Sequence, residues 1–205
     1  QIIRPILRGR DIKRYSYEFA NLYLICTFPS KHYDIEQFPA VKDWLINGDW
    51  VLPKSPIGTG KLRLEQTGAE HIVGGIKFKS RKKTNNKWFE TQDSINYWDD
   101  FSKPKICYSE TNNAKATKIA FDIEGYYPDK TCFVLVADEL ETIKHIYSIM
   151  SSEIFTWYMY NTSPLLNDSG ISLTKDSVLR FPVCDKGANY CLTEAEMNCI
   201  SKSLK

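Results

Sequence analysis

The stretch WFETQDSINYWDDFSKPKICYS, residues 88–109, organises the rest of the chain. A basic run precedes it, aromatic and acidic residues fill its middle, and it ends in the apolar residues Ile106, Cys107 and Tyr108. Pro104 has no backbone N–H to give to a sheet, so it is expected just before a strand and not inside it. The stretch therefore predicts a charged loop that leads through a polar connector into a buried strand.

Further strands are predicted from short apolar runs on both sides of this stretch. Three successive strands are expected at residues 106–108, 119–123 and 131–136, separated by turn signals at Asn112-Asn113 and at residues 125–129. Other short strands are expected at residues 22–27, 171–173 and 178–183.

Two helices are predicted within the chain, and a third at its end. Residues 36–47 have Pro39 in the first turn and Gly48 after the last one. Residues 138–158 form the dominant amphipathic helix, with Asp138 and Glu141 as a capping box and a possible division at Ser151-Ser152. A capping pattern at Thr193 predicts a helical tail. The fold class is therefore α+β, with a small mixed or antiparallel sheet, one dominant helix and long loops.

The bulk composition is that of an ordinary globular protein. The 205 residues suffice for one large domain or two small lobes, and 42% hydrophobic with 25% charged residues gives no sign of disorder. Six cysteines without a C-x-x-C pair, and three scattered histidines, predict reduced thiols, a cytoplasmic protein and no zinc site. No apolar run is long enough to cross a membrane. Because the chain begins with Gln1, we expect a fragment of a longer protein.

The distribution of charge says more than the net charge of +2. Residues 1–14 carry five cations against one acid, and residues 77–87 carry six cations and no acid. The second run lies in residues 48–87, which are rich in Gly, Pro, Lys and Asn and predict long loops and ribbon-like hairpins. A cationic loop on a rigid core suits an anionic partner, with nucleic acid as the leading candidate. The alternative is that both runs are simply solvated faces.

Common catalytic motifs are absent or incomplete in this sequence. The sequence GTGK at residues 58–61 resembles a P-loop, but the first glycine of that motif is missing and Leu62 replaces its Ser or Thr, so a flexible basic turn is expected. The acids Asp122, Glu124 and Asp129 suit either a metal-dependent nuclease or ordinary turns, and turns are the better interpretation. An Asn-Pro-Pro-aromatic adenine pocket and a glycine-rich S-adenosylmethionine loop are both missing. The chain is therefore predicted to be non-catalytic.

Three segments together resemble a known family. The first is RPILRGRDIKRY at residues 4–15, and the second is KWFETQD at residues 87–93 with Tyr97 and FSKPKI at residues 101–106. The third is residues 140–155 followed by Phe181-Pro182-Val183, although Met150-Ser151-Ser152 departs from the family's Leu-Asn-Ser. They resemble the TaqI-like C-terminal specificity domain, which follows the catalytic domain of adenine-N6 DNA methyltransferases, including fused type II restriction–modification and phage-defence enzymes.

The resemblance implies a DNA target-recognition domain at residues 16–192, after a linker at residues 1–15 and before the helical tail at residues 193–205. The missing N-terminal methyltransferase domain of a cytoplasmic, prokaryotic parent would bind S-adenosylmethionine and flip the adenine, and this chain would need no cofactor. This chain would bind double-stranded DNA with DNA-facing loops and read neighbouring bases. The alternatives are half of a type I restriction specificity subunit, a self-contained nuclease, or a protein-interaction module with a basic loop.

Candidate DNA contacts follow from the cationic and amide side chains of the loops. Most of them would touch phosphates, whereas Arg63, Arg81, Asn85 and Asn86 have the fork or amide geometry that reads bases. The full set is Lys54, Lys61, Arg63, Lys77, Lys79, Arg81, Lys82, Lys83, Asn85, Asn86, Lys87 and Lys175. Docking onto the catalytic domain is assigned to Arg4, Arg8 and Asp11, and a packing role to Trp88, Tyr97 and Trp98.

Overall fold

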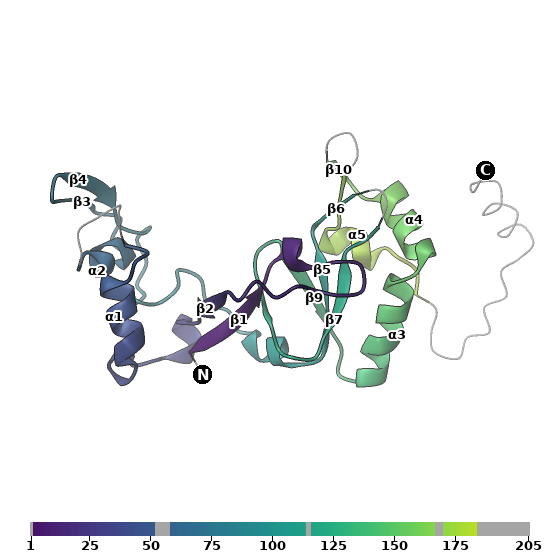
Figure 1. Ribbon diagram of the computed structural model, residues 1–205, viewed down its shortest axis with the longest axis horizontal. Coiled ribbons are helices and arrows are strands. Elements are labelled where there is room, and N and C mark those ends of the chain that lie inside the picture. The colour runs from purple at the N-terminus through teal and green to yellow at the C-terminus, as the bar shows by residue number, and fades with distance from the viewer. Residues whose placement is uncertain (1, 52–57, 114–115, 167–169, 184–205) are drawn as a thin grey trace, which may run out of the picture.

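The computed structural model describes residues 2–51, 58–113, 116–166 and 170–183. It is elongated, with a lobe at each end of a ribbon of two strands, β1 (Ile3–Leu7) and β2 (Tyr23–Ile25) (Figure 1). We call the described residues 29–97 the arm lobe and the described residues 98–183 the scaffold lobe. The predicted tail at residues 193–205, like Lys54, lies outside the described residues.

The centre of the scaffold lobe is β5 (Lys105–Ser109), which begins directly after Pro104 as predicted. It lies between β7 (Ile119–Asp122) and β9 (Cys132–Val136) and pairs with both in antiparallel register. All five residues of β5 are buried, so both faces of this sheet are covered. The three predicted strands are confirmed, and so is the α+β class.

The predicted turn at Asn112-Asn113 is wrong. These residues belong to β6 (Thr111–Asn113), which pairs with β11 (Gly170–Ser172); β10 (Leu165–Leu166) completes that sheet. The Asn112 side chain is buried, donates to the Ser109 carbonyl at 2.6 Å and accepts from the Lys118 N–H at 2.6 Å. Its amide therefore closes the connection from β5 toward β7 from within a strand, as Asn side chains do elsewhere in turns.

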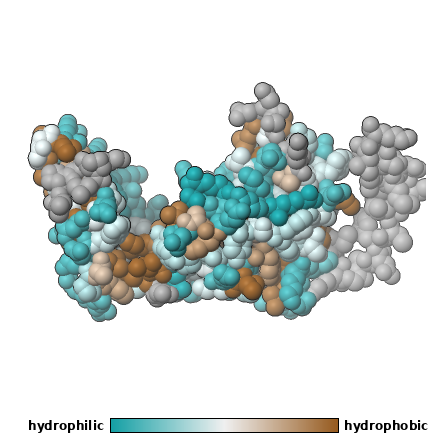
Figure 2. Space-filling view, viewed as in Figure 1, coloured by the Kyte–Doolittle hydropathy of each residue, from teal (hydrophilic) through white to brown (hydrophobic). Residues whose placement is uncertain are grey.

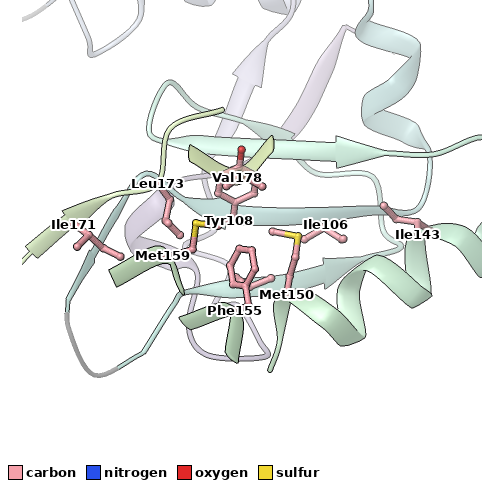
Figure 3. Packing of buried hydrophobic residues seen from close by; sticks show 10 residues of the cluster. Ile106, Tyr108, Ile143, Met150, Phe155, Met159, Ile171, Leu173 and Val178 are labelled. Atoms are coloured by element: carbon pink, nitrogen blue, oxygen red, sulfur yellow. The ribbon is translucent and has the colours of Figure 1, made fainter. Parts of the chain in front are cut away.

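Two helices cover one face of the β7-β5-β9 sheet. α3 (Leu140–Met150) and α4 (Glu153–Thr162) are separated at Ser151-Ser152, as predicted, and the Ser152 hydroxyl caps α4 by accepting from the Phe155 N–H at 3.1 Å. Figure 3 shows how the side chains of β5 and the helices point toward one another in this core: Ile106 and Tyr108 meet Ile143, Met150, Phe155 and Met159.

Two predictions, one about the start of a helix and one about the type of an element, are wrong. The capping box at Asp138 does not form, because Asp138 lies in the turn after β9 and the helix starts one residue after Glu139. The strand expected at residues 178–183 is α5 (Lys175–Leu179) and a following turn. The Thr174 hydroxyl accepts from the Ser177 N–H at 3.2 Å, and this cap outweighs the β propensity of the residues that follow.

The opposite face of the sheet is covered by the N-terminal segment. Leu7 and Ile12 pack with Cys107, Ala120 and Cys132. The segment includes the 3-10 helix η1 (Gly9–Asp11), and β1 also pairs in parallel with the short β8 (Tyr127–Pro128). The thiols of Cys26, Cys107 and Cys132 are buried and free.

A buried ion pair joins β5 to β7. The Lys105 and Asp122 side chains are both 0% exposed, and the Lys105 ammonium pairs with the carboxylate and donates to the Phe101 carbonyl at 2.6 Å. Phe101 lies in the 3-10 helix η4 (Trp98–Ser102). The carboxylate also accepts from the N–H groups of Glu124, Gly125 and Tyr126. Asp122 therefore holds the turn after β7 in place.

The arm lobe begins with the 3-10 helices η2 (Pro29–Lys31) and η3 (Ile35–Gln37), followed by the predicted helix α1 (Pro39–Asn47). Of the flexible turn expected at residues 58–61, Gly58 does lie in a turn, whereas Gly60 and Lys61 begin α2 (Gly60–Leu64), which packs against the end of α1. A Cβ at Gly60 would lie 2.2 Å from the Leu45 carbonyl oxygen, so only glycine permits this approach. In the described part of the chain, no helix is long and apolar enough to span a bilayer.

Candidate nucleic-acid interface

A β-hairpin forms the far end of the arm lobe (Figure 1). β3 (Glu70–Val73) pairs with β4 (Ile76–Lys79) in antiparallel register, which confirms the predicted ribbon. Gly74 and Gly75 between them both have positive φ, 58° and 78°, as a two-residue hairpin turn requires. Side chains alternate along β4, so Phe78 is buried whereas Lys77 and Lys79 are exposed. The hairpin therefore directs its two lysines away from its apolar side.

The buried side of the hairpin is held by aromatic contacts. The rings of His71 and Phe78 stack with centroids 5.5 Å apart, and the Arg63 guanidinium carbon lies 4.6 Å from the Phe78 centroid. On the exposed side, Lys77 forms an ion pair with Glu70 at 2.7 Å. Arg63, which the sequence analysis gave as a candidate base-reading residue, therefore packs against the hairpin.

The basic segment after the hairpin is fixed by Arg81. Its Nε donates to the Leu64 carbonyl at 2.7 Å and its Nη2 to the Trp88 carbonyl at 2.6 Å. Burial lowers the pKa of this guanidinium from its ordinary value. The backbone of Arg81 also bonds to Glu65 and Gly68. The guanidinium therefore ties α2 to the basic segment.

Three further side chains hold the same segment, and the sequence had marked only Asn86. Gln66, 5% exposed, donates to the carbonyls of Lys87 and Glu90 at 3.1 and 2.8 Å. Asn86 donates to the carbonyls of Thr91 and Gln92, both at 3.0 Å. The Glu90 carboxylate accepts from the Lys87 N–H at 2.8 Å. Only this last contact has a local sequence signal, an acid three residues after its partner; Gln66 reaches across more than twenty residues.

These hydrogen bonds fix the backbone from within, and the lysine side chains remain exposed to solvent. The described part of the arm lobe exposes six of the lysines that the sequence marked, with the exposed amide of Asn85 between them; they are Lys61, Lys77, Lys79, Lys82, Lys83 and Lys87. The Lys87 ammonium also donates to the Tyr33 carbonyl at 3.3 Å, and the Lys61 ammonium lies 5.9 Å from the centroid of the Trp88 ring. The arm lobe thus combines a fixed backbone with an exposed cationic surface, which we call the lysine surface.

Other residues that the sequence analysis assigned to DNA contact or to packing lie outside the lysine surface. Lys175 is the first residue of α5, in the scaffold lobe and away from the lysine surface (Figure 1). Trp88 packs beside Phe89, and Trp98 lies against the core around Phe101, so the packing role predicted for both is confirmed. Tyr97 is 61% exposed, and its ring meets the Phe101 ring edge to face with centroids 5.7 Å apart.

The residues assigned to docking lie in the N-terminal segment, in β1 and around η1. Arg8 binds Asp11 through two side-chain hydrogen bonds of 2.8 and 2.7 Å, and its backbone N–H donates to the same carboxylate at 3.0 Å. The hydrogen bonds from the Arg8 side chain lower the pKa of Asp11. The Arg4 guanidinium carbon lies 5.7 Å from the centroid of the Tyr127 ring. Arg8 and Asp11 therefore bind each other, and Asp11 is only 6% exposed.

Comparison with known proteins identifies the family to which these elements belong. A comparison with curated proteins gave no match. A family model, the TaqI-like C-terminal specificity domain, matches residues 4–183. The match begins on β1, passes through the arm lobe with its lysine surface and ends just after α5, so it spans both lobes. The chain therefore belongs to the TaqI-like C-terminal specificity domain family.

Proposed function

We propose that this chain is the DNA target-recognition domain of an adenine-specific DNA methyltransferase or of a fused type II restriction–modification enzyme. In this proposal the arm lobe grips duplex DNA beside the adenine that a separate catalytic domain flips. The observation that carries it is the lysine surface on a backbone fixed by Arg81, Gln66 and Asn86. Membership of a specificity-domain family supplies the class of ligand.

The physical basis is a preorganised set of cations. Lysine ammonium groups neutralise backbone phosphates and release condensed counterions, which provides affinity but no sequence information. Because the internal hydrogen bonds already order the basic segment, less conformational entropy is lost on binding. A two-stranded ribbon also fits the major groove, where every base pair has a distinct pattern of donors and acceptors.

Among the residues expected to read bases, the arrangement favours Asn85. Its side chain is exposed between the lysines, and an amide can pair with the N6 and N7 atoms of adenine. Arg81 and Asn86 donate their N–H groups to backbone carbonyls, so we assign them to shaping the loop. β1 and η1 enter the fold between the two lobes, and we assign the docking of the catalytic domain, which would bind S-adenosylmethionine, to Arg4, Arg8 and Asp11 of this segment.

The test is the salt dependence of DNA binding by the whole chain, measured by fluorescence anisotropy with a labelled duplex. Each neutralised phosphate contributes about −0.9 to the slope of log K against log salt. Replacing both Lys82 and Lys83 with alanine is expected to make the slope less steep by up to about 1.8. The matched control replaces Lys103 and Lys144, two exposed lysines of the scaffold lobe, and should leave the slope unchanged.

Three results would count against the proposal. A slope that stays the same in the Lys82 and Lys83 variant means that this loop faces away from DNA. Wild-type chain that binds no duplex at low salt removes the proposed function itself. Cleavage of the duplex by the isolated chain in magnesium would instead favour the nuclease alternative. An Asn85→Ala variant adds a check on base reading, because it should keep the slope and lose discrimination among duplexes.

A further inference from the structure

A pocket of about 420 Å³ opens on the scaffold lobe, apart from the lysine surface. Three segments that are distant in sequence line it. Arg8 and Arg10 come from the N-terminal segment. Ser109, Thr111 and Lys118 come from the end of β5, from β6 and from just before β7, and Asp129 and Thr131 come from the turn before β9. Six of the seven lining residues carry a cation or a hydroxyl group, and the function proposed above uses only Arg8 among them, for docking.

The walls are fixed by contacts that demand a particular residue. The Gly9 N–H donates to the Thr131 hydroxyl at 3.0 Å, and a Cβ at Gly9 would lie 2.3 Å from the Thr131 carbonyl oxygen. The 3-10 helix η1 therefore packs directly on the turn before β9, which only glycine permits. This contact sets Arg8 and Arg10 on either side of Gly9, and the pair with Asp11 fixes the Arg8 side chain.

The hydrogen bonds within the pocket show which of its polar groups already have a partner in the protein. The Thr131 hydroxyl and N–H both donate to Asp129 Oδ1, at 2.7 and 2.8 Å. The Ser109 hydroxyl donates to the Thr111 carbonyl at 3.0 Å. The Thr111 hydroxyl, in contrast, has no hydrogen-bond partner among the described residues. One hydroxyl donor therefore remains for a ligand, beside the fixed carboxylate.

The charges of the pocket are unequally paired. Arg8 is matched by Asp11, and Asp129 is the one acid on the wall, with Oδ1 turned to Thr131. Arg10 and Lys118 form no ion pair within the described residues, and they reach the pocket from different segments. Two unpaired cations that converge with a hydroxyl on one cavity form a site for an oxyanion.

We propose that this pocket binds one backbone phosphate of the same duplex that the lysine surface grips. Arg10 and Lys118 neutralise the phosphate, and the Thr111 hydroxyl donates a hydrogen bond to it. This inference rests on the proposed function. In Figure 1, η1 and the β3–β4 hairpin lie on either side of the β1–β2 ribbon. A hydrophilic band covers the N-terminal segment on the drawn face (Figure 2). In this proposal the duplex spans the β1–β2 ribbon and contacts both lobes.

The test repeats the salt titration with the whole chain and the variants Arg10→Ala, Lys118→Ala and both together. Because the two cations share one phosphate, the double variant is expected to lose about 0.9 of the slope, as one contact would, and not about 1.8. The loss of affinity between about 50 mM and about 200 mM salt then shrinks by about 3.5-fold. Lys130→Ala is the matched control, because Lys130 is exposed next to Asp129 but does not line the pocket.

The outcomes separate this inference from the proposed function. If the double variant keeps the wild-type slope while the Lys82 and Lys83 variant loses part of it, the pocket does not contact DNA and only this inference fails. If wild-type chain shows no salt-dependent DNA binding, both fail. Equal slope changes in Lys130→Ala and the double variant would mean that general charge acts here, and would also overturn the site.

A second measurement distinguishes the source of the phosphate. Inorganic phosphate is titrated into the labelled chain while the amide NMR signals of Gly9 and Thr131 are followed. The proposal expects shifts that the double variant abolishes, together with the changed DNA slope. Shifts with an unchanged DNA slope would identify a free phosphate as the ligand and overturn the assignment to DNA. Thermal melting of each variant verifies that the fold is retained.

Discussion

Two lysines on either side of Pro104 give a sharp test of how this scaffold is stabilised. Lys103 pairs with Asp100 at 2.7 Å, with side chains 47% and 33% exposed. Lys105 pairs with Asp122, and both side chains are 0% exposed. The substitution Lys→Met removes one positive charge at either position and keeps nearly the same side-chain volume. Only the surroundings of the two ion pairs differ.

The two variants should differ by about 2–3 kcal/mol. An exposed ion pair contributes about 0–1 kcal/mol, so Lys103→Met is expected to cost less than about 1 kcal/mol. Lys105→Met leaves the Asp122 carboxylate buried without its counter-charge, which costs about 3–5 kcal/mol. The three N–H groups that bind Asp122 stabilise the remaining charge, so we expect a value near the lower limit, about 3 kcal/mol. In a protein of this size that lowers Tm by about 6–12 °C.

Urea denaturation of both variants, followed by tryptophan fluorescence, measures these costs. Adding Asp122→Asn to Lys105→Met should recover part of the loss, because no unpaired charge then remains in the interior. Equal losses at Lys103 and Lys105 would refute the reasoning. So would a Lys105→Met cost below about 1 kcal/mol, since the buried pair would then behave as an exposed one.

Three further outcomes follow from individual contacts. Arg81→Met removes two hydrogen bonds to carbonyls, so amide hydrogen exchange in residues 80–92 should accelerate while exchange in β5 stays slow. Asp11→Asn should cost about 2 kcal/mol near neutral pH. Because the folded pKa of Asp11 is lowered, that loss persists above the unfolded pKa of about 3.9 and disappears as pH falls through the folded pKa, as chemical denaturation against pH will show. Ser152→Ala should cost about 1 kcal/mol in thermal unfolding, because it removes the cap of α4.

The elements that the sequence predicted correctly are those with local causes. Pro104 before an apolar run specifies the start of β5, and three- to four-residue spacing of apolar side chains specifies α3 and α4. The secondary-structure predictions were wrong where a single polar side chain determines the local backbone conformation. Asn112 closes a connection from within a strand, and Thr174 starts a helix where Val178 and Leu179 suggested a strand.

The candidate site shows the same division. The sequence located the cationic run, and the family match covers that region. It did not distinguish Arg81, which binds two carbonyls, from Lys82 and Lys83, which are exposed. Nor did it indicate that Arg10 and Lys118 reach one pocket.

The sequence by itself therefore determined the three central strands, the helices α1, α3 and α4, the amount of charge and the segment that carries it. Hydrophobic periodicity and proline act over a few residues, and so they can be recognised in one dimension. Only the tertiary structure decided which charges are buried and which are exposed. Lys103 and Lys105 are the same residue type on either side of Pro104, yet one is exposed and the other is buried. The partner of a polar group can also lie far away in the sequence: the Gly9 N–H donates to the Thr131 hydroxyl across 122 residues. Burial and pairing are properties of that assembled neighbourhood, because the cost of desolvating a charge depends on everything packed around it.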